Sequence, residues 1–145
     1  MLDHERIEER LKKLKEYLKI LKGYQKYSFK IYKDNETLRG AVERYFQLSV
    51  EAVIDIGEII ISNMELRKAE DSRDVIDILG EAKVIPDKFA YHFGPVAGFR
   101  NILVHDYLDI DNQEVYSHLQ KDLGDFDKFA KYIAKYLIKF GRFPG

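Results

Sequence analysis

The chain has 145 residues, a formal net charge of −1 and no cysteine. This length suffices for one domain that buries about two-thirds of its unfolded surface. The missing cysteines exclude a disulfide framework, a thiol nucleophile and a cysteine-based zinc site. A nearly neutral charge argues against a broad nucleic-acid coat held by counterion release. No apolar run approaches the ~20 residues of a membrane span, and the charged N-terminus is not a signal peptide. We therefore expect one soluble, cytoplasmic domain over residues 1–145 with no membrane contact.

The first predicted helix runs from about Asp3 to Lys22, and Gly23 is expected to end it. Its apolar residues recur at three- and four-residue steps on one stripe. Residues 10–33 hold nine Lys or Arg side chains against Glu16 alone. Two interpretations of this basic run stay open. It is either a solvated helix face or a stripe that helps an RNA or a protein partner to dock.

An aromatic segment, 24–33, is expected to form a short helix across the bundle. Asp34 or Asn35 then caps a long helix that reaches roughly to Met64. Within it, Glu51, Asp55 and Glu58 share one face because they recur at four- and three-residue steps. They form a solvated acidic stripe, or else one of them approaches Arg100 or a partner subunit and changes the charge there.

The second half of the chain is predicted to contain shorter helices. Ser72 is the expected N-cap of a helix that ends near Lys83, and Pro86 the expected first residue of the next. Gly94-Pro95 predicts a break, after which a helix restarts at Pro95 and continues through Val104.

Asp111 or Asn112 is expected to cap the following segment, and Gly124 marks a bend or a new start before a last amphipathic helix that ends at about Phe140. Strand-like alternation is nearly absent. Four main amphipathic helices with additional short ones predict an all-α, up-and-down four-helix bundle.

The segment Phe99–Tyr107 carries the chemistry, because it places an arginine, an amide, an imidazole and a phenol at the end of an apolar helix. Arg100 offers a planar, permanently charged fork for phosphate. His105 exchanges protons near neutral pH, with an unperturbed pKa near ~6.5. A helix advances ~100° per residue, so Asn101 and His105 face the same way, with Arg100 on the flank. If the helix frays after Val104, His105 can instead swing toward Arg100.

The spacing Arg-x-x-x-x-His-x-Tyr resembles the ribonuclease signature of the HEPN superfamily, specifically the HepT toxins of the HepT–MntA type. The match falls on Arg100, Asn101, His105 and Tyr107, and the segment 43–56 is similar to the family's long central helix. Length and helix order also fit. The resemblance implies a HEPN-like helical fold and metal-independent RNA cleavage without a cofactor, in a type VII-like toxin–antitoxin pair. It further implies an MNT-type nucleotidyltransferase partner that neutralises the toxin by adding AMP to Tyr107.

RNA supplies its own nucleophile, since a 2′-hydroxyl can attack the adjacent phosphate. His105 fits the role of base or acid, Arg100 stabilises the developing charge, and Asn101 orients the phosphate or fixes the histidine tautomer. The expected products are a 2′,3′-cyclic phosphate and a 5′-hydroxyl. In-line transfer works best with both an acid and a base, so we predict a homodimer whose composite site joins two motifs.

The remaining histidines are assigned structural or solvent roles: His4 near the terminus, His118 on a short helix, and His92, which is expected to be partly buried. A metal site built from His92, His105 and Asp106 or Asp109 has no ligand spacing to support it. The alternative function is a non-catalytic HEPN module that binds a nucleotide or docks an MNT nucleotidyltransferase. A purely structural helical dimer is a third possibility.

Overall fold

The computed structural model describes the backbone of residues 3–105 and 111–141, and the side chains of these residues except 100–105 and 141. The described residues form helices and no strand. The α-helices are α1 (Asp3–Tyr24), α2 (Phe29–Asp34), α3 (Glu36–Asn63), α4 (Ser72–Glu81), α5 (Asp87–His105), α6 (Asn112–Lys121) and α7 (Leu123–Tyr136), and a π-helical turn, η2 (Leu137–Gly141), follows α7.

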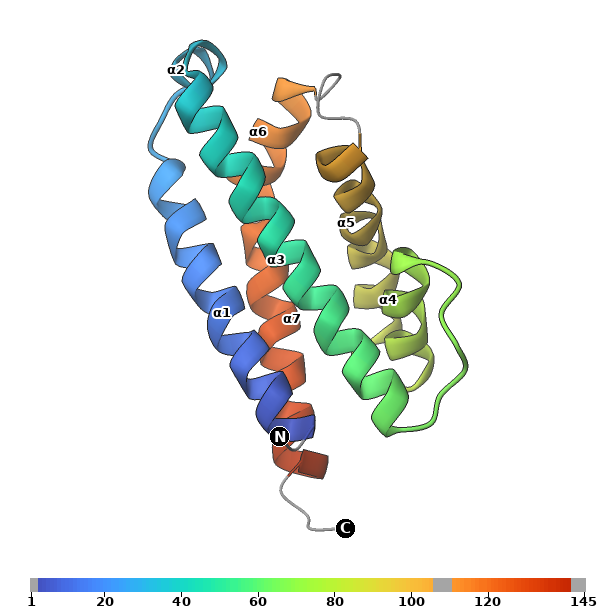
Figure 1. The fold of residues 1–145 in the computed structure, drawn as a ribbon. Helices are drawn as coiled ribbons and strands as arrows, with labels where there is room; N and C mark the ends of the chain where they lie inside the picture. Colours follow the sequence, from blue (N-terminus) through green and yellow to red (C-terminus); the bar gives the residue numbers. More distant parts are fainter. Residues whose placement is uncertain (1–2, 106–110, 142–145) are drawn as a thin grey trace.

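Four long helices, α1, α3, α5 and α7, alternate in direction and form the body of the molecule (Figure 1). The short helices α2 and α6 lie at the end of the bundle where α5 finishes, and α4 packs beside the first half of α5 (Figure 1). The predicted all-α, up-and-down bundle with additional short helices is therefore confirmed. None of the described helices combines the length and the apolar character needed to cross a membrane.

α1 packs along α3 through the predicted apolar stripe, all of which is buried: Ile7, Leu11, Leu14, Leu18 and Leu21. The prediction that Gly23 ends the helix is wrong, because α1 continues through it to Tyr24. Gly23 is exposed, and a β-carbon there would meet no atom within 4 Å. A glycine ends a helix where the backbone turns left-handed or where another atom comes too close for a side chain. Neither condition holds at Gly23.

Polar side chains cap α3, α4 and α6, and two of these three caps are at predicted positions. Asn35 caps α3 as expected, accepting from the Leu38 N–H at 2.9 Å. Asp111 caps α6, accepting from the Gln113 N–H at 2.9 Å. Ser72 was expected to cap α4, but the cap is Asp71, which accepts from the Asp74 N–H at 2.8 Å. A carboxylate is the better acceptor at the positive end of a helix, so the preceding residue takes the role.

The predicted break at Gly94-Pro95 is also wrong, because α5 is one continuous helix from Asp87 to His105. Pro95 removes the hydrogen bond to the carbonyl four residues earlier, that of Tyr91. Tyr91 is 81% exposed and Pro95 is exposed, so water can reach this side of the helix. Pro86 also lies just before α5 rather than in it, and its carbonyl accepts from the Ala90 N–H at 2.9 Å.

Aromatic rings fill the space between α5, α7 and α3. Phe93 is fully buried, stacked on Phe89 and Phe129 at centroid distances of 5.0 and 5.5 Å, with Phe126 edge-on at 5.5 Å. Phe126 belongs to α7, which begins at Leu123 and includes Gly124 in its first turn, so Gly124 marks a helix start. This aromatic cluster fixes α5 along most of its length.

Candidate functional site

Arg100, Asn101 and His105 all belong to the last two turns of α5, whose backbone is helical through His105. The helix therefore extends one residue past the predicted end at Val104 and does not fray before the histidine. Asn101 and His105 stand four residues apart, on one face and about 6 Å apart along the helix axis. Tyr107, Asp106 and Asp109 lie outside the described residues, so the structure does not place them.

Phe99, the residue before Arg100, is fixed in the core by two other helices. It is 6% exposed, and its ring lies edge-on to Phe46 of α3 at a centroid distance of 6.2 Å. On the other side it packs against the imidazole of His118 on α6, at 4.6 Å. The backbone that carries the motif is thus held between α3 and α6, which favours precise positioning of the motif residues.

A polar row on α3 flanks Phe46 at the same end of the bundle: Glu43, Gln47 and Glu51, each half-buried and four residues from the next. Gln47 donates to Glu51 at 3.1 Å between Nε2 and Oε1. Burial raises the pKa of the Glu43 carboxyl, and the nearby Arg39 guanidinium partly opposes this rise. Sequence reasoning singled out Glu51 but missed Glu43 and Gln47. Their four-residue spacing beside the apolar stripe was the available signal.

Tyr32 of α2 is buried next to this row. Its hydroxyl has no hydrogen-bond partner among the described residues. Burial, followed by the negative charge of Glu43, holds the pKa of this phenol far above its usual range. The ring lies 5.4 Å from that of Tyr116, whose hydroxyl donates to the Tyr27 carbonyl at 2.6 Å. These tyrosines join α2 to α6 at the end of the bundle where α5 finishes.

His92 and His118, whose side chains the structure describes, both pair with carboxylates. His118 is half-buried, and its Nδ1 is hydrogen-bonded to Asp122 of the next turn. His92 was expected to be partly buried, but it is exposed, with Nε2 2.9 Å from Asp125 Oδ2 on α7. It lies on the exposed side of α5, since its neighbour Phe93 takes the core position. Both histidines connect helices or helix turns, in agreement with their predicted structural roles.

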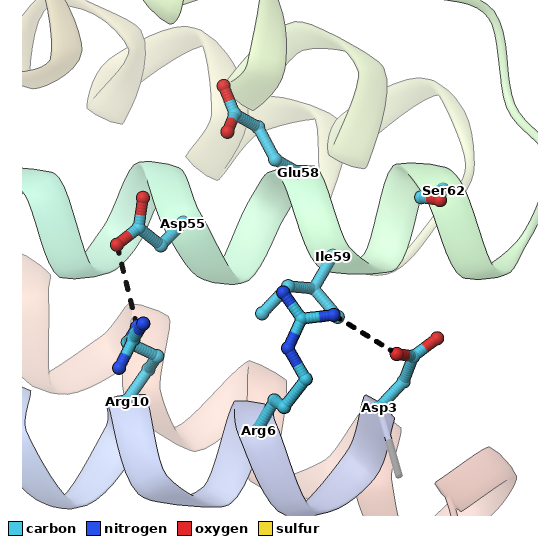
Figure 2. Close-up of a pocket in the computed structure, with 7 residues that line it drawn as sticks. All are labelled: Asp3, Arg6, Arg10, Asp55, Glu58, Ile59 and Ser62. Carbon is cyan, nitrogen blue, oxygen red and sulfur yellow. Dashed lines mark hydrogen bonds and ion pairs between the residues drawn. The ribbon is translucent and has the colours of Figure 1, made fainter. Parts of the chain in front are cut away.

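Two residues of the acidic stripe, Asp55 and Glu58, line a cleft of about 300 Å³ between α1 and α3 (Figure 2), whereas Glu51 belongs to the polar row with Gln47. Arg10 Nε lies 3.5 Å from Asp55 Oδ2, and Arg6 Nη1 lies 3.3 Å from Asp3 Oδ1. Glu58 lines the same cleft and is exposed. Because the lining carboxylates offset the two guanidinium groups and the lining contains no histidine, we interpret the cleft as an ion-paired seam between α1 and α3.

Residues 7–133 match the family model described as Ribonuclease HepT-like. A tRNA nuclease HepT from Aphanizomenon flos-aquae is 31% identical over 132 residues, which cover 91% of this chain and 90% of that protein. An mRNA nuclease HepT from Shewanella oneidensis is 31% identical over 102 residues, which cover 70% of this chain and 77% of that protein.

A solved structure of the tri-AMPylated Shewanella oneidensis HEPN toxin in complex with MNT antitoxin superposes with a TM-score of 0.82. It is 27% identical and covers 93% of this chain and 99% of that one. YutE from Bacillus subtilis, described as a cytosolic protein of unknown function, has a TM-score of 0.85 at 24% identity, covers 99% of this chain and 96% of that one, and supports the fold alone. The match over most of the chain confirms the family predicted from the motif and its enzyme class, a ribonuclease. The chain belongs to the HepT-like ribonuclease family.

Proposed function

We propose that this chain is a metal-independent endoribonuclease toxin that cleaves RNA with Arg100, Asn101 and His105. The observation that carries the proposal is the position of these residues. They occupy the end of α5, directly after a phenylalanine held between α3 and α6. The nuclease names of the two HepT relatives support RNA as the substrate. The proposal places the protein in the cytoplasm, where RNA substrates and a reducing milieu suit a chain without cysteine.

In the proposed reaction, the 2′-oxygen of the RNA attacks the adjacent phosphorus while the bond from phosphorus to the 5′-oxygen breaks. His105 of one motif accepts the proton of the 2′-hydroxyl, and an acid protonates the departing 5′-oxygen. Arg100 neutralises the charge that builds on the phosphoryl oxygens. Asn101 shares the His105 face of α5 and orients the phosphate or the imidazole. The products are a 2′,3′-cyclic phosphate and a 5′-hydroxyl.

We infer that the second proton-transfer group comes from a second copy of the chain. One chain supplies a single histidine at the motif, whereas in-line transfer works best with an acid and a base together. A two-fold axis that brings two α5 ends together would supply the pair. Mixed dimers that combine wild-type chains with His105→Ala chains test this arrangement. Full activity per mixed dimer would contradict the composite site.

The proposed partner is an MNT-type nucleotidyltransferase antitoxin that adds AMP to Tyr107. The solved complexes of HEPN toxins with MNT antitoxin, one of them AMPylated, support this partnership. Tyr107 follows the described end of α5 by two residues. An AMP group next to Arg100 would occupy the position of the RNA phosphate. Mass spectrometry of Tyr107→Phe protein co-expressed with the partner should show no adduct.

The decisive experiment incubates the purified protein, shown by mass to lack AMP, with total RNA in EDTA beside His105→Ala. We expect the wild type to cleave RNA and to leave cyclic phosphate ends, and the variant to lose about 10²- to 10⁴-fold in rate. Absence of cleavage by unmodified wild type across tRNA, rRNA and mRNA would favour the alternative function, a non-catalytic HEPN module that binds a nucleotide or docks the MNT subunit.

A further inference from the structure

A groove of about 500 Å³ runs between α1 and α7, which lie side by side in the bundle (Figure 1). Its lining includes Leu18 of α1 and two small residues of α7, Ala130 and Ala134. Leu18 and Ala130 are buried, and Ala134 is half-buried. Because alanine side chains stop at the β-carbon, the two helices leave an open channel where larger residues would fill the seam.

Lysines border both sides of this groove. Lys15, Lys19 and Lys22 come from α1, and Lys131 comes from α7, 109 residues beyond Lys22 in the sequence. Towards the other end of α1, Lys12 and Lys15 continue the same border beside an adjoining groove of about 340 Å³. Part of the basic run, Lys12, Lys15, Lys19 and Lys22, therefore lies along one wall of a groove, and α7 adds a lysine to the opposite wall.

The positive charge of the groove is largely uncompensated. Asp127 is the one carboxylate among the described residues that line it, and it pairs with Lys22 at 2.8 Å. Within the part of the chain that the structure describes, Lys15, Lys19 and Lys131 form no ion pair. All three are exposed. The chain as a whole has a net charge of −1, so this positive charge is local to the groove. A groove of this charge is complementary to a polyanion.

The spacing of the lysines also suits a nucleic-acid strand. Lys15, Lys19 and Lys22 are four and three residues apart, which separates them by about 6 and 5 Å along the helix axis. Successive side chains can therefore follow successive phosphates of one strand. A purely solvated face would not require lysines on both walls of a groove or a lining of small residues.

The groove leads toward the end of the bundle that carries the motif. At the end of α1, the Gln25 side chain donates to the Leu119 carbonyl of α6 at 2.9 Å. Gln120 of α6 in turn donates to the Gln25 carbonyl at 2.9 Å. The same helix places His118 against Phe99, the residue before Arg100. α6 thus contacts both the segment that follows α1 and the residue before the motif on α5.

We propose that the groove between α1 and α7 binds the phosphate backbone of the RNA substrate and holds the strand while a distant phosphate is cleaved at the end of α5. This inference rests on the proposed function and deepens it by adding an RNA-binding surface outside the motif. The contacts are electrostatic and independent of base sequence, so they raise affinity without selecting the cleavage position.

The test measures the affinity of a fluorescein-labelled tRNA transcript for His105→Ala protein with and without Lys15→Gln, Lys19→Gln and Lys131→Gln together. Loss of three phosphate contacts should make the negative slope of log K against log salt shallower by about 2. Affinity at 50 mM salt should fall by more than about 10-fold. The matched control removes three exposed basic side chains away from the groove, Lys68→Gln, Arg73→Gln and Lys88→Gln, and should leave both values near those of the parent.

Equal effects of the groove and control triple variants would show that tRNA affinity depends on net charge alone, and would overturn the proposal. An absence of tRNA binding by the parent protein would also overturn it. Retained tRNA affinity with lost affinity for the MNT-type nucleotidyltransferase would overturn it too and would assign the groove to a protein. Failure of catalysis gives a different pattern. If the wild type cleaves nothing but tRNA binding still depends on the groove lysines, the proposed chemistry fails and the groove stands.

Discussion

α5 and α1 differ in how their polar residues are supported. α5 carries the motif directly after Phe99, and rings from α3, α6 and α7 fix its buried face. α1 buries one apolar stripe and leaves its lysines exposed along a groove. Bond making at phosphorus tolerates little misplacement of the catalytic groups, whereas attraction of a phosphate strand tolerates mobile side chains. The two helices thus suggest a division between chemistry and substrate binding.

The largest effect on stability within α5 is expected at Phe93, which is fully buried among three other phenylalanines. Phe93→Ala should lower the free energy of unfolding by about 3–5 kcal/mol, because it removes these contacts and leaves a cavity. Urea denaturation measures the change. Tyr91→Ala, on the exposed side of the same helix, should stay within about 0.5 kcal/mol of wild type. Similar losses for both would show that α5 is not held by this cluster.

Phe99→Leu should separate support of the motif from overall stability. The smaller ring-free side chain loosens the contacts with Phe46 and His118 and costs roughly 1–2 kcal/mol. The cleavage rate at saturating protein should nevertheless fall about 10- to 100-fold, since small misplacements of catalytic groups are costly. Phe89→Leu, a similarly buried residue at the other end of α5, is the control. An equal fall in rate for Phe89→Leu would contradict a specific role of Phe99.

Glu43→Gln should change the pH dependence of stability. Burial raises the pKa of Glu43, so the folded state retains a proton that the unfolded state has lost. The associated stability is present below the usual carboxyl value of 4.5 and is lost as pH rises through the raised pKa. Glu43→Gln should therefore raise Tm at pH 7, and the gain should shrink toward pH 4. Glu9→Gln on the exposed face of α1 should show no such trend, and a gain that is constant with pH would argue against this origin.

The smallest expected effect concerns the hydroxyl of Tyr32, which is buried without a described partner. Tyr32→Phe removes the cost of desolvating this group and keeps the ring contact with Tyr116. The free energy of unfolding should rise by about 1 kcal/mol in urea denaturation. Tyr116→Phe is the comparison variant, because its hydroxyl donates to the Tyr27 carbonyl, and it should be destabilising. A loss of stability in Tyr32→Phe would show that the hydroxyl is satisfied.

The sequence was sufficient to predict the bundle, because apolar periodicity marks the buried stripes of α1, α3 and α7 directly. It was misleading at Gly94-Pro95, where the break depends on whether the freed carbonyl is buried or exposed, a property of packing. The motif was found through a family signature carried by four residues. The groove could not be predicted from the sequence, because Lys15 and Lys131 line one groove only when α1 packs beside α7.

One measurement tests the division between α5 and α1 most directly: single-turnover cleavage of labelled tRNA in EDTA across a range of protein concentrations. It compares wild type, His105→Ala, and the triple variant Lys15→Gln, Lys19→Gln and Lys131→Gln. The account predicts that His105→Ala loses about 10²- to 10⁴-fold in maximal rate while tRNA affinity is kept. The triple variant should need more than about 10-fold more protein but reach the wild-type rate. A triple variant with a reduced maximal rate and unchanged affinity, or a His105→Ala protein that cleaves like wild type, would contradict it.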